Sequence, residues 1–299
     1  MSDSKKDSQR TPTHLVAVDM DGTLLDGQGK LPPQFPELLA HLAERGVLLA
    51  PASGRQLATL KNMFDPFGMR LPVIAENGTV VHDGYSIVST TAMSDETVHA
   101  VIDAINAHNA REEAQAKSPQ EFADRRLNLV VCRPECAFVD SLADIPGAAP
   151  ARTGTTLAEE IEKYYNEHSV VADLHEVVNG EVIKLAIFSS TDAEGIAAPL
   201  AFATAPDDAV AVSGQHWVDI MHPQANKGHA LEALAKDLGI APENTYGFGD
   251  YLNDLELLKS AGTAYAMANA HQKLKDIADH IAPANTDNGV AKVLYELFP

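Results

Sequence analysis

Short apolar runs recur towards both ends of the chain, and most of them stop at a polar residue or a glycine. These runs predict buried strands at residues 15–18, 47–50, 72–75, 245–249, 263–267 and 280–282. Between them, apolar residues return at helical spacing, as in residues 38–46 and 230–238. Strands that alternate with helices predict an α/β fold with a doubly wound, mostly parallel sheet.

The pattern changes between about residues 84 and 219. Ser94 precedes a helical pattern through residues 98–105, and a second helix is expected over residues 157–168. Strands are expected at residues 127–131, 182–188, 209–212 and 217–220. Antiparallel strands mixed with helices predict an α+β domain that is inserted into the α/β core.

We therefore expect two domains, which suits a length of 299 residues. In this prediction residues 13–83 and 220–299 form the catalytic core, residues 84–219 form the inserted domain, and residues 1–12 are a flexible tail. The tail is polar, so no secretory signal is expected. No run approaches the roughly 18 apolar residues of a membrane span.

Two acidic residues, Asp19 and Asp21, follow the first predicted strand at alternate positions, and Gly22 comes next. A loop at the glycine would let both acids turn towards one point beyond the strand end, where open α/β sheets bind ligands. Two carboxylates about 4 Å apart repel by roughly 4 kcal/mol at an effective dielectric constant of about 20. Mg²⁺, which prefers oxygen ligands, would relieve this repulsion. A plain Asp-Gly turn is the alternative.

Polar residues also follow the second and third predicted strands. Ser53, Gly54 and Arg55 stand between a strand and a helix, where a hydroxyl and free backbone N–H groups can hold an anion. An ordinary helix N-cap by Ser53 is the alternative. Asn77 precedes a glycine after the third strand, and alone this pair is a turn signal.

The core pattern resumes after residue 220. Lys227 lies in the first turn of a predicted helix, where a positive charge is unfavourable unless an anion or carboxylates lie opposite. A solvated lysine is the alternative. Asp250 follows the strand at residues 245–249, and Asn253 and Asp254 come one helical turn later. These acids indicate either metal binding beside Asp19 or an ordinary helix cap.

Taken in order, four segments resemble the motifs of the haloacid dehalogenase superfamily of phosphohydrolases, in its Cof-like branch. The segments are Asp19-Met20-Asp21-Gly22-Thr23-Leu24-Leu25, Ser53-Gly54-Arg55, Asn226-Lys227-Gly228 and Gly249-Asp250-Tyr251-Leu252-Asn253-Asp254. Residues 266–270 resemble the branch's Ala-Met-Gly-Asn-Ala, with Ala268 in place of the glycine. The resemblance implies a Rossmann-like core and a cap domain inserted between the second and third motifs.

The resemblance also implies a role for each motif residue. Asp19 would attack phosphorus, Asp21 would act as general acid and base, and Lys227 would steady the phosphoryl charge and the nucleophile. The implied ligands of Mg²⁺ are Asp19, Asp21, Asp250 and Asp254. Asp254 would bind the ion directly or through a bound water, or it would only tether Lys227. The implied phosphate-binding residues are Gly22, Ser53, Gly54, Arg55, Asn77 and Asn253.

Composition narrows the choice of partner. Lys and Arg number 22 against 42 Asp and Glu, a net charge of −20, which disfavours nucleic acid and anionic membranes as partners.

Two cysteines make no disulfide framework, so a cytoplasmic location is expected. The 12 histidines lack paired ligand spacing and are assigned no chemistry, as at His14, His41, His82 and His216. We expect a monomer or a weak homodimer.

These observations predict a Mg²⁺-dependent phosphomonoester hydrolase that acts on a small phosphorylated metabolite. By resemblance a sugar phosphate comes first, and pyridoxal phosphate or a flavin nucleotide stays open. A phosphosugar mutase is a second hypothesis. A non-hydrolytic regulator that accepts a phosphoryl group on Asp19, like a receiver domain, is a third. Receivers are single domains of roughly 120 residues without such an insert, which disfavours the third.

Overall fold

The computed structural model describes residues 12–67, 70–149, 156–212 and 215–299. The predicted tail, residues 1–12, lies outside this part of the chain except for its last residue. The described residues form two compact units. The first comprises the described parts of Met1–Gly54, Asn62–Ser89 and Asn226–Pro299, and the second those of Arg55–Lys61 and Thr90–Ala225.

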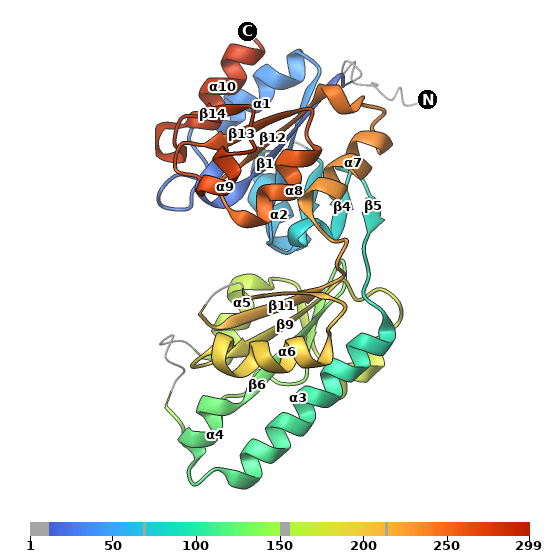
Figure 1. The fold of residues 1–299 in the computed structure, drawn as a ribbon, viewed down its shortest axis with the longest axis vertical. Helices are drawn as coiled ribbons and strands as arrows, with labels where there is room; N and C mark the ends of the chain where they lie inside the picture. The colour runs from blue at the N-terminus through green and yellow to red at the C-terminus, as the bar shows by residue number, and fades with distance from the viewer. Residues whose placement is uncertain (1–11, 68–69, 150–155, 213–214) are drawn as a thin grey trace, which may run out of the picture. The chain divides into compact units, whose positions relative to one another are not determined.

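An eight-stranded sheet forms the centre of the first unit, in the order β14-β13-β12-β1-β2-β3-β4-β5 (Figure 1). Its strands are β1 (His14–Asp19), β2 (Val47–Ala52), β3 (Val73–Ala75), β4 (Val80–His82), β5 (Ile87–Thr90), β12 (Thr245–Gly249), β13 (Thr263–Met267) and β14 (His280–Ala282). The pairs from β14 to β3 are parallel, and β4 pairs with β3 in the antiparallel sense. The chain therefore winds outwards in both directions from β1, and the α/β class is confirmed.

Helices cover this sheet because each connection between parallel strands must cross over. They are α1 (Phe35–Glu44), α7 (Lys227–Asp237), α8 (Leu255–Ser260), α9 (Gln272–Lys275) and α10 (Gly289–Leu297). Helix α2 (Leu57–Phe64) is divided between the two units, because its residues up to Lys61 group with the second unit. Helices α1 and α10 lie side by side, and α8 packs between α7 and the strands β12 and β13. The central strand β1 is buried from Leu15 to Asp19, as its apolar run predicts.

A six-stranded sheet, in the order β10-β11-β9-β6-β7-β8, forms the second unit. The strands are β6 (Leu127–Cys132), β7 (Ala137–Val139), β8 (His168–Val170), β9 (Lys184–Ser189), β10 (Ala209–Val212) and β11 (Trp217–Met221), and the helices are α3 (Asp95–Gln115), α4 (Pro119–Arg125), α5 (Leu157–Tyr164) and α6 (Ala198–Thr204). Strands β7 and β8 pair in parallel, and the other neighbouring strands of this sheet pair in the antiparallel sense. The apolar side of α3, including Val98 and Ile102, packs on the sheet in one buried cluster with Ala201 of α6.

Three details differ from the predicted boundaries. Helix α5 ends at Tyr164 rather than residue 168, because the chain then pairs with β7 as the strand β8. The sheet of the second unit continues through β11 to Met221, past the predicted junction at residue 219. Residues 55–61, expected in the core, group with the second unit. The role of this unit as a substrate-specificity domain stays a prediction.

The described part of the chain has no helix that is both long enough and apolar enough to cross a membrane.

Candidate active site

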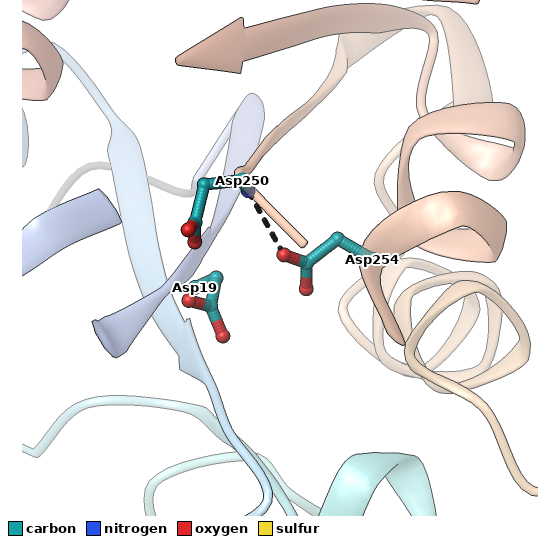
Figure 2. Close-up of side chains that lie close together, drawn as sticks. All are labelled: Asp19, Asp250 and Asp254. Atoms are coloured by element: carbon teal, nitrogen blue, oxygen red, sulfur yellow. Dashed lines mark hydrogen bonds between the residues drawn. The ribbon is translucent and has the colours of Figure 1, made fainter. Parts of the chain in front are cut away.

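The predicted acidic residues meet at one edge of the first unit's sheet. Strands β1 and β12 pair in parallel, with Val18 opposite Phe248. The residues at their carboxyl ends therefore lie side by side at the same edge of the sheet. Asp19 is the last residue of β1, and Asp250 directly follows β12. Asp19, Asp250 and Asp254 each offer a carboxylate oxygen, and these oxygens lie within 4.8 Å of one another (Figure 2).

The fully buried ammonium group of Lys227 joins two of these carboxylates. Its Nζ atom lies 2.5 Å from Oδ1 of Asp19 and 2.6 Å from Oδ1 of Asp254. Lys227 is the first residue of α7, where the helix dipole opposes a positive charge. The two carboxylates offset this unfavourable position, and the solvated-lysine alternative is therefore wrong.

Asp254 uses both of its oxygens within the protein. Its Oδ1 accepts the hydrogen bond from Lys227, and its Oδ2 accepts hydrogen bonds from the backbone N–H groups of Asp250 (3.0 Å) and Tyr251 (3.2 Å). The side chain folds back so closely that a Cβ atom at Gly249 would lie 2.5 Å from the Cβ of Asp254. Asp254 thus holds Lys227 and the loop that carries Asp250 in fixed positions.

Gly22 permits the loop after β1 to approach Asp250. Its φ angle is +83°, in the region that favours glycine, and a Cβ atom there would lie 2.3 Å from Oδ2 of Asp250. The next residue, Thr23, is buried and donates a hydrogen bond from Oγ1 to Oδ1 of Asp250 at 3.0 Å. The glycine is therefore required by both conformation and space.

Burial shifts the titration of this cluster. Burial raises the pKa of Asp19 above its usual range, and the nearby ammonium of Lys227 offsets this only in part. Burial also raises the pKa of Asp250, while the hydroxyl of Thr23 acts in the opposite direction. For Lys227, burial alone would lower the pKa, but the carboxylates of Asp19 and Asp254 raise it above its usual value.

The charge balance makes the cluster a good site for a cation. The cluster holds three carboxyl groups and one ammonium group, so two negative charges lack a counterion when all three carboxyl groups are ionised. The donor atoms are all oxygen, which fits a hard divalent ion such as Mg²⁺. Asp19 and Asp250 are the residues best placed to bind it, because Asp254 already accepts three hydrogen bonds.

The phosphate-binding residues predicted after β2 and β3 form a second group. Buried Ser53 follows β2, and its carbonyl oxygen accepts a hydrogen bond from the N–H of Asn77 at 2.9 Å. A Cβ atom at Gly54 would lie 3.0 Å from Nδ2 of Asn77. Asn253 donates from Nδ2 to Oδ1 of Asn77 at 3.3 Å. Ser53, Gly54 and Asn253 therefore all lie next to Asn77 in space.

A close backbone contact joins this group to the lysine. A Cβ atom at Gly78, which has a φ angle of +98°, would lie 2.3 Å from the carbonyl oxygen of Asn226. Asn226 is the N-cap of α7, and its side chain accepts a hydrogen bond from the N–H of His229. The loop after β3 therefore packs directly against the start of the helix that carries Lys227.

Two predicted residues lie outside the three-carboxylate cluster. The side chain of Asp21 is exposed and is not a member of the three-carboxylate cluster. Arg55 is partly exposed and groups with the second unit. Their predicted roles, acid–base catalysis for Asp21 and phosphate binding for Arg55, stay predictions.

Sequence reasoning assigned no role to several residues that hold the first loop. Asn269 donates from Nδ2 to the carbonyl oxygen of Gly22 at 2.8 Å, and Asn285 donates from Nδ2 to that of Leu25 at 2.9 Å. The N–H of Asn285 in turn donates to Oδ1 of Asn269 at 3.2 Å. The available signal was the position of Asn269 just after β13, at the same edge of the sheet.

Comparison with known proteins gives a match over nearly the whole chain. The family model described as haloacid dehalogenase-like hydrolase matches residues 16–294. The 5-amino-6-(5-phospho-D-ribitylamino)uracil phosphatase YwtE of Bacillus subtilis is 28% identical over an aligned length of 287 residues, and the alignment covers 94% of this chain and 97% of the relative. The HMP-PP phosphatase of Cronobacter sakazakii is 26% identical over 269 residues, 89% of this chain and 88% of the relative.

Solved structures agree on the fold. A haloacid dehalogenase-like hydrolase from Bacteroides thetaiotaomicron superposes with a TM-score of 0.74 at 21% identity, covering 96% of this chain and 100% of that one. The subclass IIB sugar phosphatase BT4131 superposes with a TM-score of 0.69 at 19% identity, covering 95% of this chain and 99% of that one.

Proposed function

Because the chain belongs to the haloacid dehalogenase-like hydrolase family, we propose that it hydrolyses phosphate monoesters through an aspartyl-phosphate intermediate with the help of Mg²⁺. Its named relatives are phosphatases, and this chain is a phosphatase of small phosphorylated metabolites. The intermediate, the metal and the roles of individual residues are the proposal.

The Asp19 carboxylate is the observation that supports the proposal most. One of its oxygens is held by Lys227 at 2.5 Å, which fixes the side chain at the end of β1. Its other oxygen is the nucleophile. It attacks phosphorus in line, the bond from phosphorus to the ester oxygen breaks, and the phosphoryl group is then bound to Asp19.

Asp21 handles the protons in this proposal. Its carboxylic acid gives a proton to the leaving alkoxide in the first step. In the second step the same carboxylate takes a proton from water, which attacks phosphorus and releases Asp19 and inorganic phosphate. The exposed position of Asp21, two residues after the nucleophile, leaves it accessible to both the leaving group and water.

The remaining residues bind charge. Asp19, Asp250 and the carbonyl oxygen of Asp21 would hold Mg²⁺, which neutralises phosphoryl oxygens when it is bound. Asp254 keeps Lys227 in place and would contact the metal through a bound water. The phosphoryl group is bound by Lys227 and by Gly22, Ser53, Gly54, Arg55, Asn77 and Asn253.

For the substrate we propose a sugar or sugar-alcohol phosphate. The relative YwtE carries in its name a phosphoribityl compound, and BT4131 is described as a sugar phosphatase. We assign recognition of the leaving group to the inserted domain, residues 84–219. We further propose a cytoplasmic monomer or weak homodimer.

Release of free phosphate is the test. The purified chain is incubated with a panel of sugar phosphates, sugar-alcohol phosphates, pyridoxal phosphate and a flavin nucleotide, with Mg²⁺ and with a chelator. Asp19→Asn should abolish release, and the matched control Asp237→Asn, at the exposed end of α7, should not. Turnover without free phosphate would instead indicate the mutase, and a single phosphorylation without turnover would indicate the regulator.

A further inference from the structure

Two histidines and an aspartate meet in the second unit, in a cluster that the proposed hydrolysis does not use. His99 and Asp103 lie one turn apart on α3, and His175 lies in the short helical turn η4 (Leu174–Val177). The two histidines are 76 positions apart in the sequence, so no local spacing reveals them. The cluster is partly exposed, with 29% of the His175 side chain and 75% of the Asp103 side chain accessible.

The imidazole rings of His99 and His175 approach each other through their Nδ1 atoms. Nδ1 of His99 lies 2.6 Å from Nδ1 of His175. The ring centroids are 4.9 Å apart and the ring planes are inclined by only 20°, so the rings lie edge to edge in nearly parallel planes. On the opposite edge of its ring, Nε2 of His175 lies 3.2 Å from Oδ1 of Asp103. The three side chains therefore form a row with His175 in the middle.

The position of Asp103 determines which nitrogen of His175 has a free lone pair. A carboxylate accepts a hydrogen bond, so Nε2 of His175 carries the hydrogen and Nδ1 carries the lone pair in the neutral ring. That lone pair points at Nδ1 of His99. Two lone pairs at this distance repel each other, so a proton or a metal ion must lie between the nitrogens. The same carboxylate–imidazole arrangement orients histidines that bind metals.

We propose that His99 and His175 bind one transition-metal ion through their Nδ1 atoms, with Asp103 as the residue that orients His175. Metal–nitrogen bonds of about 2.0–2.1 Å place two ligand nitrogens roughly 2.9–3.4 Å apart, so the rings separate by a few tenths of an ångström on binding. Asp103 lies across the ring from the ion and is not a third ligand, and water completes the coordination.

The chemistry of the ligands selects the ion. Imidazole suits Zn²⁺, Cu²⁺ and Ni²⁺, whereas carboxylate clusters suit Mg²⁺. This site is therefore distinct from the carboxylate cluster of Asp19, Asp250 and Asp254 in both position and preference. A bound ion joins α3 to η4, which are already in contact, and binding to the folded state stabilises the second unit.

Copper and zinc binding to the full chain test the proposal. Cu²⁺ bound to imidazole gives an electron paramagnetic resonance spectrum with nitrogen couplings, which a carboxylate cluster does not give. With one equivalent of Cu²⁺ the protein should show two coupled nitrogens, and titration calorimetry should measure the matching Zn²⁺ affinity. His99→Gln and His175→Gln should each lose at least about tenfold in Zn²⁺ affinity, and Asp103→Asn roughly 10- to 100-fold.

Two control variants separate this site from others. Asp250→Asn alters the carboxylate cluster and should leave the nitrogen couplings unchanged. His280→Gln, at an exposed histidine of the first unit, should leave the Zn²⁺ affinity unchanged. A copper spectrum with oxygen ligands only, or equal Zn²⁺ affinity in the wild type and in the double variant of His99 and His175, would overturn the proposal.

Discussion

Replacement of Lys227 by methionine tests how the candidate site is held together. Methionine has a similar length but no charge, so the change leaves the carboxylates of Asp19 and Asp254 buried without their cation. Loss of one partner from a buried ion pair destabilises a protein by about 3–5 kcal/mol, because the remaining charge is uncompensated. We expect a loss of this size in the free energy of unfolding of the first unit, measured without divalent ions.

The assay must report on the first unit. The protein's single tryptophan, Trp217, lies in the second unit and is unsuitable as a probe. Amide hydrogen exchange of β1 and β12 in increasing denaturant gives the required free energy. Lys259→Met is the matched control, because Lys259 contacts Glu256 at 2.7 Å with about half of each side chain exposed. An exposed pair of this kind contributes about 0–1 kcal/mol.

Mg²⁺ provides a second, independent readout. If it binds beside Asp19, it should restore part of the stability lost in Lys227→Met and none of any loss in Lys259→Met. Activity should stay low in Lys227→Met even when stability recovers, because the phosphoryl group lacks its ammonium partner. A free energy of unfolding within about 1 kcal/mol of the wild type, without Mg²⁺, would refute the role assigned to Lys227.

Further predictions concern the loop, the pH dependence and the metal. Gly22→Ala should abolish most activity and Mg²⁺ binding. A Cβ atom there would lie 2.3 Å from Oδ2 of Asp250, and the left-handed backbone adds roughly 1–2 kcal/mol of strain. Turnover at the wild-type rate in this variant would contradict the prediction. In the metal-free protein the raised pKa values of Asp19 and Asp250 favour their protonated forms. The contribution of these two carboxyl groups to stability should be present below about pH 4 and be lost as the pH rises through their folded-state pKa values. Thermal unfolding measured from pH 4 to 9 should show this loss in the presence of a chelator and much less of it in the presence of Mg²⁺. Ca²⁺ should bind but support little phosphate release, because its looser coordination misplaces the in-line geometry, and equal rates with both ions would contradict this.

Much of the site could be predicted because it depends on strand ends. Asp19 and Asp250 each terminate an apolar run, and the carboxyl ends of parallel strands meet at one edge whatever the details of packing. Lys227 was assigned to the site by its resemblance to the family's third motif, because the helix dipole alone left a solvated lysine as the alternative. Periodicity placed these residues at strand and helix ends, and the resemblance to the family's motifs assigned their roles.

Other features depend on contacts between distant segments. The hydrogen bonds of Asn269 and Asn285 to the first loop join residues 247 and 260 positions apart, so their existence requires the register of β13 and β14. The contact between His99 and His175 requires the packing of α3 on η4. The end of α5 at Tyr164 is set by the pairing of β8 with β7, which overrides the helical pattern that continues to residue 168.

Detection of a phosphoryl group on Asp19 is the most direct test of the proposed function. Asp21→Asn slows hydrolysis of the intermediate in this account, so acid quenching of that variant during turnover of a fast-leaving phosphate ester, followed by mass spectrometry of peptides, should find phosphate on Asp19. The double variant with Asp19→Asn should show none. Phosphate on another residue, or wild-type turnover that persists in Asp19→Asn, would contradict the account.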